Sequence, residues 1–238
     1  MPANRFFSDN FFIVNMELTL AAEESRHLLK IMRHKLGDVV ELVNGRGQLA
    51  QASITKADKR NCLLSIDSVE EKKQASHTMV IAQGIPRINR LDCIIEKCTE
   101  LGMDKLYLFP STGSEKKELS AQQKKRCQSL AIAAMKQCGR LFLPEIEFRD
   151  SLQDCIDGQA LMFFGDIRPH SLPLKNHLDD ASDDRDIIFF IGPEKGFSDG
   201  EHQQLEDMGA IAVKLHDNIL RTDTAPLVAM SIIKHHLL

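Results

Sequence analysis

The stretch Ile191-Gly192-Pro193-Glu194-Lys195-Gly196-Phe197-Ser198 indicates the fold of this protein more clearly than any other part of the sequence. It follows the apolar run 186–190, which predicts a buried strand, and the Gly-Pro pair predicts a sharp turn. Ser198 and Glu201 then form an S-x-x-E capping box, which predicts a helix that ends at Gly209. A strand that passes through a glycine-containing loop into a helix N-terminus is a place where α/β proteins bind small polar or anionic ligands.

A second junction of the same kind follows at once. Residues 212–215 predict a short strand, and the loop 218–224 leads from it into a C-terminal helix. Arg221 lies in this loop. Two such loops at one edge of a sheet, with an arginine in one of them, make an active-site candidate.

The composition bounds the class of protein. The chain has 238 residues, enough for one large domain or two small ones. It has no run of about eighteen apolar residues, and its N-terminal residues lack the apolar segment of a signal peptide, so we expect no membrane association. The cysteines form no C-x-x-C pair, so we expect no metal site and read them as reduced thiols of a cytoplasmic protein. They are Cys62, Cys93, Cys98, Cys127, Cys138 and Cys155.

The acidic charge is concentrated in one part of the chain. The formal net charge is −4, but residues 150–210 alone hold 14 Asp and Glu against 4 Lys and Arg. Much of that acidity falls in the loop 179–186, which we expect to be solvated. The remaining surface can therefore present a basic face to an anionic partner, although the excess is weak evidence for nucleic acid when taken alone.

The hydrophobic period changes near residue 74 and divides the chain in two. Residues 1–73 predict a β-rich unit, with a helix over 22–32, a hairpin around the turn 44–47 and a further strand over 62–69. Residues 74–238 alternate strands with amphipathic helices, which predicts a largely parallel sheet with helices on both faces. The strands of this second part are expected at 79–82, 106–109, 145–148, 160–164, 186–190 and 212–215.

Several motifs in this order resemble those of one family, the 16S ribosomal RNA uridine-N3 methyltransferases. They are Arg5-Phe6-Phe7, His27-Leu28 through Arg33 to Gly37-Asp38, Thr99-Glu100-Leu101-Gly102, Gln137-Cys138-Gly139-Arg140, Ile191 to Ser198, and Ile219-Leu220-Arg221-Thr222-Asp223-Thr224-Ala225. The resemblance covers nearly the whole chain and is more specific than any single motif.

The resemblance implies an α/β fold in which a PUA-like β-barrel, residues 1–73, precedes a SPOUT-type trefoil-knotted domain, residues 74–238. It also implies a homodimer that uses S-adenosylmethionine to methylate N3 of a uridine in 16S ribosomal RNA, within the small subunit. In that family three loops after successive strands hold the cofactor. Carried over by position, the cofactor-binding residues are Phe164, Gly165, Ile191, Gly192, Gly196, Leu215, Ile219, Leu220 and Thr224.

The chemistry of uridine methylation points to Arg221 and Glu194 as candidate catalytic residues. N3–H is weakly acidic, and an arginine can stabilise the uridinate by donating two parallel hydrogen bonds. Alternatively, Arg221 bridges Asp223 or a facing subunit. Glu194 orients an arginine or the RNA, or only caps its own turn. The positions that match the motifs also predict phosphate contacts. These RNA-binding candidates are Arg5, Arg33, Arg90 and Arg140.

Some positions depart from the family's pattern and motivate an alternative, a non-catalytic RNA-binding protein with a degraded cofactor site. Lys195 stands where the family has a second glycine, Lys136 where it has a glutamate, and His216-Asp217-Asn218 replaces G-x-R. Lysine is strained at positive φ, so we expect Lys195 to have an ordinary φ and a side chain directed at solvent or RNA.

The last helix carries one apolar stripe at helical spacing, formed by Leu227, Met230, Ile233 and Leu237. We interpret this stripe as a dimer interface, with burial inside the chain as the alternative.

Overall fold

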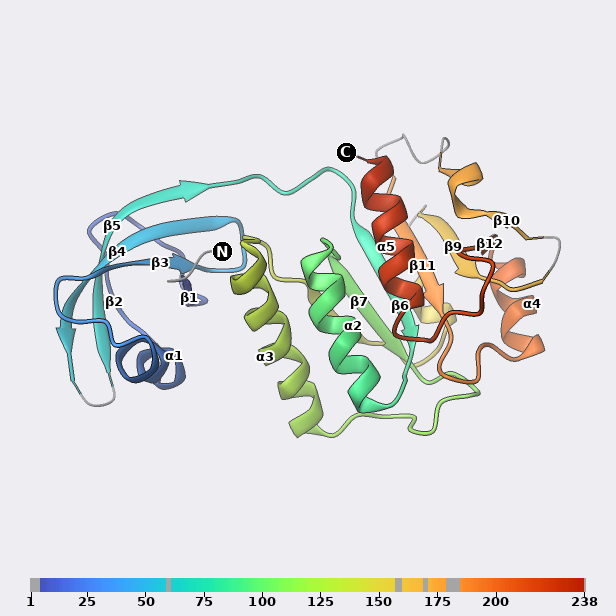
Figure 1. Ribbon diagram of the computed structural model, residues 1–238, viewed down its shortest axis with the longest axis horizontal. Coiled ribbons are helices and arrows are strands. Elements are labelled where there is room, and N and C mark those ends of the chain that lie inside the picture. Colours follow the sequence, from blue (N-terminus) through green and yellow to red (C-terminus); the bar gives the residue numbers. More distant parts are fainter. Residues whose placement is uncertain (1–4, 59–60, 157–159, 169–170, 179–184, 238) are drawn as a thin grey trace. The chain divides into compact units, whose positions relative to one another are not determined.

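The computed structural model describes residues 5–58, 61–156, 160–168, 171–178 and 185–237 (Figure 1). The acidic loop 179–186 therefore lies almost wholly outside the described residues. The chain forms two compact units: residues 1–74 with 132–143, and residues 75–131 with 144–238. Each unit is described by itself.

The first unit is built on a five-stranded sheet in the order β1-β3-β4-β5-β2. Its strands are β1 (Arg5–Phe7), β2 (Glu17–Thr19), β3 (Val39–Val43), β4 (Gln48–Ala57) and β5 (Cys62–Glu71). β1 pairs with β3 in parallel, and the remaining pairs are antiparallel. The helix α1 (Ala22–Arg26) continues into a π-helical turn over His27–Ile31.

The expected hairpin between β3 and β4 is confirmed, and its glycines explain the turn. Gly45 and Gly47 both have positive φ, of 70° and 94°. A Cβ on Gly47 would also lie 2.5 Å from the carbonyl oxygen of Lys72. Only glycine satisfies both conditions, so the turn sets the register of the two strands. The strands bury one apolar core, which includes Phe6, Leu42 and Leu64.

The second unit contains a seven-stranded sheet in the order β10-β12-β9-β11-β6-β7-β8, in which every neighbouring pair is parallel. Its strands are β6 (Met79–Gly84), β7 (Lys105–Phe109), β8 (Glu145–Phe148), β9 (Leu161–Gly165), β10 (Leu172–Pro173), β11 (Ile187–Ile191) and β12 (Ile211–Lys214). The expected parallel α/β architecture is confirmed.

Helices cover both faces of this sheet. Its helical segments are α2 (Ile88–Glu100), η2 (Gln153–Cys155), η3 (Leu174–His177), α4 (Asp199–Asp207) and α5 (Ala225–His236), together with the first part of α3 (Ala121–Cys138). α2 and α5 lie side by side on one face (Figure 1). On the other face Leu205 of α4 and Cys155 of η2 pack on Val80, Phe164 and Phe190.

The central strand β11 is buried along its whole length, because both faces of the sheet are covered. This explains its uninterrupted apolar sequence, Ile187-Ile188-Phe189-Phe190-Ile191. The helices that follow the strands begin and end where the sequence predicts. Ser198 and Glu201 form both bonds of the capping box on α4, and Ser120 and Gln123 do the same on α3.

The apolar stripe on α5 is mostly buried within the second unit. Met230 and Ile233 are fully buried, and Leu227 and Leu237 are half-buried. Helix α5 contacts α2 and β11, so the sheet uses this stripe for its own core. The interpretation of the stripe as a free dimer interface is therefore wrong for its two central residues.

Candidate functional site

A cavity of about 560 Å³ lies at the carboxyl ends of β9, β11 and β12. The three strands are parallel neighbours, so the loops that follow them meet at one edge of the sheet. Its volume is within the range of small-molecule pockets, about 300–1,000 Å³. The predicted residues that line it are Gly165, Ile191, Gly192, Glu194, Gly196, Leu215, Ile219, Leu220 and Arg221, and Arg90 joins them.

The structure does not bring two of the predicted cofactor residues into this lining. Phe164 is fully buried, and its ring packs edge-to-face on His202, with the ring centroids 5.5 Å apart. It therefore supports the cavity from within the core. Thr224 is exposed at the start of α5, outside the lining, and its side chain makes no capping bond.

The loop after β11 is a tight turn that only glycine permits at two positions. The N–H of Gly196 donates to the carbonyl of Pro193 at 2.8 Å, and Gly196 has a φ of 73°. A Cβ on Gly192 would lie 2.8 Å from the carbonyl carbon of Gly196. A side chain would clash with this turn at Gly192 and would be strained at Gly196. The two glycines therefore expose backbone N–H and carbonyl groups at this side of the cavity.

Lys195 sits in the same turn with an ordinary backbone conformation. The non-glycine residues with positive φ, among those the structure describes, are Asn15 and Arg33. The side chain of Lys195 is exposed at the edge of the cavity. The expectation of an ordinary φ at this lysine is confirmed, and Gly196 takes the left-handed conformation in its place.

A buried glutamine joins the loop after β11 to the loop after β12. The side-chain amide of Gln83, which is fully buried, lies 3.0 Å from the carbonyl oxygen of Gly192 and 3.1 Å from the hydroxyl of Thr222. The Thr222 hydroxyl itself donates to the Gly192 carbonyl at 2.7 Å. Sequence reasoning missed both side chains, although one glutamine in the apolar strand β6 was a usable signal.

Arg221 and Arg90 differ in their surroundings. Arg90 donates to the carboxylate of Asp223 at 2.6 Å, and 30% of its side chain is exposed. Arg221 is exposed at the cavity and forms no side-chain hydrogen bond or ion pair within the described part of the chain. Arg221 makes no ion pair with Asp223, so the alternative in which it bridges that carboxylate is not supported. The guanidinium of Arg221 is available to a substrate.

Glu194 has a structural partner at the start of α2. Its Oε1 accepts a hydrogen bond from the backbone N–H of Arg87, at 2.9 Å. Arg87 precedes the first residue of α2 and also pairs with Glu115. A carboxylate beside a helix N-terminus is stabilised by the helix dipole. This contact ties the loop after β11 to α2 and favours a positioning role for Glu194.

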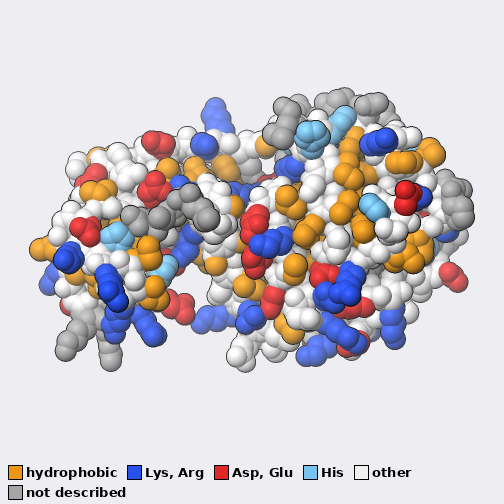
Figure 2. All heavy atoms as spheres, viewed as in Figure 1, with side chains coloured by type: hydrophobic (Ala, Val, Ile, Leu, Met, Phe, Trp, Pro, Cys, Tyr) orange, Lys and Arg blue, Asp and Glu red, His pale blue; other side chains and the backbone are white. Residues whose placement is uncertain are grey.

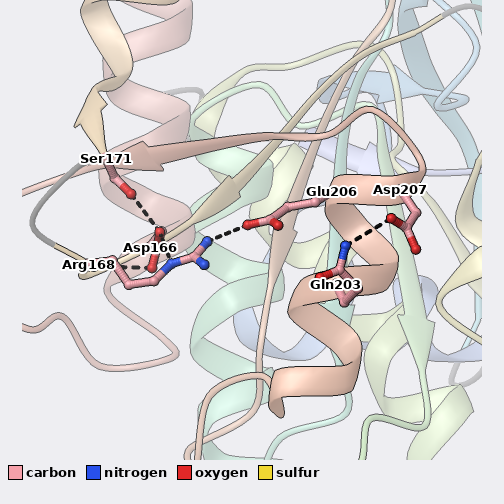
Figure 3. A network of polar contacts seen from close by, with 6 residues as sticks. All are labelled: Asp166, Arg168, Ser171, Gln203, Glu206 and Asp207. Atoms are coloured by element: carbon pink, nitrogen blue, oxygen red, sulfur yellow. Dashed lines mark hydrogen bonds and ion pairs between the residues drawn. The ribbon is translucent and has the colours of Figure 1, made fainter.

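The loop after β9 is held by a carboxylate that sequence reasoning missed (Figure 3). Asp166 is 6% exposed and accepts hydrogen bonds from the Ser171 hydroxyl at 2.5 Å and from Arg168 Nε at 2.7 Å. The guanidinium of Arg168 also donates a hydrogen bond from Nη2 to Oε1 of Glu206 on α4, at 2.6 Å. Burial raises the pKa of Asp166, but the hydrogen bonds from Ser171 and Arg168 outweigh it and hold the pKa below its ordinary value. The charged carboxylate therefore connects this loop to α4.

The RNA-binding candidates of the first unit lie in different environments. Arg5 pairs with Glu41 at 2.9 Å, and only 9% of its side chain is exposed, so it fits a structural role better than a phosphate contact. Arg33 is exposed and has a φ of 61°. Arg140 is half-buried. Lys and Arg side chains gather over α1 (Figure 2).

Lys136 makes a contact that explains its charge. Its ammonium group pairs with Glu24 of α1 at 2.5 Å, and both side chains are less than one-fifth exposed, at 15% and 17%. The other oxygen of Glu24 accepts a hydrogen bond from the backbone N–H of Phe7. Lys136 thus stabilises the packing of the first unit.

No helix among the described residues is long and apolar enough to cross a membrane.

Comparison with known proteins identifies both parts of the chain. Residues 72–234 match the model of an RNA methyltransferase domain, and residues 20–67 match that of an RNA methyltransferase PUA domain. The chain is 27% identical to ribosomal RNA small subunit methyltransferase E of Bacillus subtilis, over 91% of this chain and 89% of that protein.

Solved structures with a similar fold point to the same family as the sequence comparison. The Neisseria gonorrhoeae ribosomal RNA small subunit methyltransferase E, solved with bound S-adenosyl methionine, is 25% identical, with a TM-score of 0.86 over 98% of this chain and 97% of that one. A Legionella pneumophila protein with bound S-adenosyl methionine is also 25% identical, with a TM-score of 0.89 over 97% of this chain and 96% of that one. The RNA methyltransferase model covers well over half of the sequence, and the chain belongs to the RNA methyltransferase family.

Proposed function

We propose that the protein transfers a methyl group from S-adenosylmethionine to N3 of a uridine in 16S ribosomal RNA. The observation that carries the proposal is the glycine-lined cavity with Arg221 at its edge, unpaired within the described residues. Relatives of similar length and fold are named as small-subunit ribosomal RNA methyltransferases, and two such folds were solved with the methyl donor bound.

The residues of the cavity fit the methyl donor. Two sides of the cavity are the Gly192–Gly196 turn and the loop that contains Leu215 and Leu220. A Cβ on Gly165 would make ordinary van der Waals contacts with Phe189 at 3.9 Å and Leu215 at 4.0 Å, so lack of space does not require this glycine. S-adenosylmethionine supplies an electrophilic methyl group when it is bound. Glycine-containing turns let a ligand reach backbone N–H groups and carbonyls, which hold it by hydrogen bonds.

Arg221 acts on the uracil ring in this proposal. Methylation at N3 requires loss of the N3 proton to solvent water, which leaves negative charge on the ring nitrogen and the two flanking carbonyl oxygens. The N3 nitrogen then takes the methyl group, and S-adenosylhomocysteine is the leaving group. A guanidinium donates parallel hydrogen bonds and stays charged at every physiological pH, so it stabilises that anion without giving up its own proton. Glu194 and Arg90 position the loops around it through Arg87 and Asp223.

The proposed RNA surface includes the exposed basic side chains of the first unit. Arg26, Lys30, Arg33 and Lys35 lie on α1 and the turn after it, and all four are exposed. Arg140 completes the proposed set, and Arg90 is left out of it because its guanidinium pairs with Asp223. Arg5 is left out of it because its ion pair with Glu41 occupies the guanidinium. Phosphate contacts of this kind give affinity and register rather than base specificity.

The proposal extends to assembly and topology. It includes a homodimer, a trefoil knot where the chain crosses the loop after β11, a substrate within the small ribosomal subunit, and action in the cytoplasm. The hydrogen bond between Thr222 and Gly192 supports the crossing, because it holds two loops 30 residues apart against each other. Light scattering checks the dimer, and a stable monomer at micromolar concentration would contradict it.

The alternative of a non-catalytic RNA-binding protein has lost much of its motivation. Lys195 has an ordinary φ, and Lys136 is paired with Glu24. In His216-Asp217-Asn218, the third place where the sequence departs from the family's pattern, the ring of His216 accepts a hydrogen bond from the N–H of Asn218 at 3.0 Å. This bond closes a local turn. None of these residues blocks the cavity with a strained backbone.

Calorimetry with S-adenosylhomocysteine separates the two functions. The enzyme is expected to bind S-adenosylhomocysteine, which is the methyl donor after loss of its methyl group, and Lys195→Gly is expected to change this affinity by less than tenfold, because the lysine side chain is exposed. If the protein does not bind S-adenosylhomocysteine, or if Lys195→Gly raises the affinity far more than tenfold, the natural site is degraded and the non-catalytic alternative holds.

A further inference from the structure

The hydroxyl of Thr222 connects the loop after β12 to the loop after β11 by bonds whose direction is unambiguous. It lies 3.1 Å from the side-chain nitrogen of Gln83 and 2.7 Å from the carbonyl oxygen of Gly192. A carbonyl oxygen can only accept a hydrogen bond, so the hydroxyl donates to Gly192 and accepts from Gln83. Thr222 is 8% exposed and Gln83 is fully buried, so both bonds are largely shielded from water.

The orientation of the Gln83 amide is also fixed by its neighbours. Besides Thr222, its nitrogen lies near three backbone carbonyl oxygens, those of Gly84 at 2.9 Å, Gly192 at 3.0 Å and Ile191 at 3.3 Å. Turning the amide over would place its oxygen against these acceptors, so the nitrogen must face them. The Gly192 carbonyl is therefore held by two side chains, one from β6 and one from the loop after β12.

Thr222 follows Arg221 directly in the chain, so its bond to Gly192 also constrains the backbone of the arginine. Farther along, the carbonyl oxygen of Arg221 accepts hydrogen bonds from the N–H groups of Thr224 and Ala225, both at 2.9 Å, in the turn that leads into α5. The side chain of Arg221 is exposed and has no partner within the described ranges. Its backbone therefore determines where the guanidinium begins, and Thr222 ties that backbone to the turn after β11.

We propose that Thr222 is a positioning residue, whose hydrogen bond to Gly192 holds Arg221 in register with the turn at the methyl-donor cavity. The inference rests on the proposed function, in which the cavity holds S-adenosylmethionine and Arg221 acts on the uracil ring. The methyl group and the ring nitrogen must meet at one distance and angle, and a misplacement of about 1 Å can slow such a reaction roughly a hundredfold. Thr222 supports this geometry through Arg221.

Variants that lack the Thr222 hydroxyl should still fold. In Thr222→Val the side chain keeps its shape, the Gly192 carbonyl keeps the amide of Gln83, and this amide keeps its backbone acceptors. Thr222→Ala also lacks the hydroxyl, and Thr222→Ser keeps it. Thr99→Val is the matched control, because Thr99 is fully buried and its hydroxyl donates to the carbonyl of Ile95 within α2, at 2.6 Å.

Single-turnover methyl transfer to small ribosomal subunits, taken from a strain that lacks the protein, measures the effect, and calorimetry measures affinity for S-adenosylhomocysteine. Thr222→Val and Thr222→Ala are expected to lower the rate roughly tenfold and to keep the affinity within about threefold of wild type. Thr222→Ser and Thr99→Val should keep both quantities within about threefold. In an Arg221→Ala background, Thr222→Val should lower the rate by less than about threefold, because no guanidinium is left to position.

The results distinguish positioning from other roles of Thr222. If Thr222→Val lowers the rate equally with and without Arg221, Thr222 does not act through the arginine, and the inference is wrong. It is also wrong if Thr222→Ser is as slow as Thr222→Val, or if cofactor affinity falls as much as the rate, since the bond then serves the cofactor turn alone. In each of these cases the wild-type activity stands. If the wild-type protein neither binds S-adenosylhomocysteine nor methylates small subunits, the proposed function itself fails and the inference fails with it.

Discussion

At the scale of single residues, the availability of its side chain sets Arg221 apart from Arg90, the other arginine that lines the cavity. Arg5, Arg87, Arg90 and Arg168 all donate to carboxylates, whereas Arg221 is exposed at the cavity without such a partner in the described chain. An ion pair that already exists must be broken before an arginine can bind a substrate anion. Arg221 bears no such cost.

We expect Arg221→Ala to lower kcat by roughly a hundredfold or more, the scale for removing one transition-state donor. Its affinity for S-adenosylhomocysteine should stay within about threefold of wild type, because Arg221 is expected to act on the uracil ring rather than on the cofactor. Single-turnover kinetics and calorimetry measure the two quantities. An equal loss of turnover and cofactor affinity would assign Arg221 a structural role, and Arg185→Ala, at an exposed arginine before β11, serves as the control.

Asp166 gives a residue-scale prediction about pH. Its folded-state pKa lies below its ordinary value, so its hydrogen bonds stabilise the fold fully above the unfolded-state pKa, about 3.9, and this stability is lost as pH falls through the folded value. We expect Asp166→Asn to lose about 1–3 kcal/mol of unfolding free energy at pH 7, because Arg168 and Ser171 no longer have a charged acceptor.

Urea unfolding at pH 7 and at pH 3.5 checks this prediction. The difference in unfolding free energy between wild type and Asp166→Asn should be smaller at pH 3.5, where the wild-type carboxylate begins to gain its proton. Asp207→Asn, at an exposed acid of α4, should stay within about 0.5 kcal/mol of wild type. A gap of the same size at both pH values would mean that Asp166 acts by packing alone.

At the scale of elements, the site depends on the loops that follow β9, β11 and β12, which meet at one edge of the sheet. The turn after β11 is the tightest of them, since Gly192 has backbone atoms on the side where a Cβ would project. Gln83 and Thr222 then hold this turn to the loop after β12. The backbone geometry of the Gly192–Gly196 turn therefore sets one side of the cavity.

We expect Gly192→Ala to weaken S-adenosylhomocysteine binding by roughly tenfold or more, because its Cβ would lie 2.8 Å from the backbone of Gly196 and the turn would have to shift. Gly200→Ala is the matched control, as a Cβ there meets no heavy atom within 4 Å. That control should bind normally and gain up to about 1 kcal/mol of stability from helix propensity. Normal binding by Gly192→Ala would show that the turn does not touch the ligand.

The elements were predictable from the sequence to a degree that follows from local physics. The capping box at Ser198 and the continuous apolar run of β11 identified strand, turn and helix, because these signals lie within a few residues. Long-range partners were not predictable. Arg90 pairs with Asp223, 133 residues away. In the α5 stripe, which was expected at an interface, Met230 and Ile233 pack inside the sheet domain, whereas Leu227 and Leu237 are half-buried.

At the scale of the whole molecule, the charges are divided in a way that suits an anionic substrate. The four exposed basic residues on and after α1, Arg26, Lys30, Arg33 and Lys35, belong to the first unit. The acidic residues are concentrated in 150–210, in the second unit. Repulsion keeps phosphate away from the acidic segment, so the basic residues determine where RNA approaches.

We expect Arg33→Glu to weaken binding of ribosomal RNA. The slope of log K against log salt should also fall by about 0.7–0.9, because the substitution removes one arginine that neutralises a phosphate. Lys175→Glu, at an exposed lysine within the acidic segment, should leave the slope unchanged. Filter binding over a series of salt concentrations measures both. An unchanged slope for Arg33→Glu would remove this arginine from the RNA surface.

The central claim is that this RNA methyltransferase family member modifies N3 of a uridine in 16S ribosomal RNA. Mass spectrometry of 16S ribosomal RNA nucleosides, from a strain that lacks the protein and from the same strain supplied with it, tests this claim most directly. The strain that lacks the protein is predicted to lose 3-methyluridine at one position. Supplying the wild-type protein should restore this nucleoside, and supplying the Arg221→Ala variant should not. Unchanged 3-methyluridine in the strain without the protein would contradict the claim.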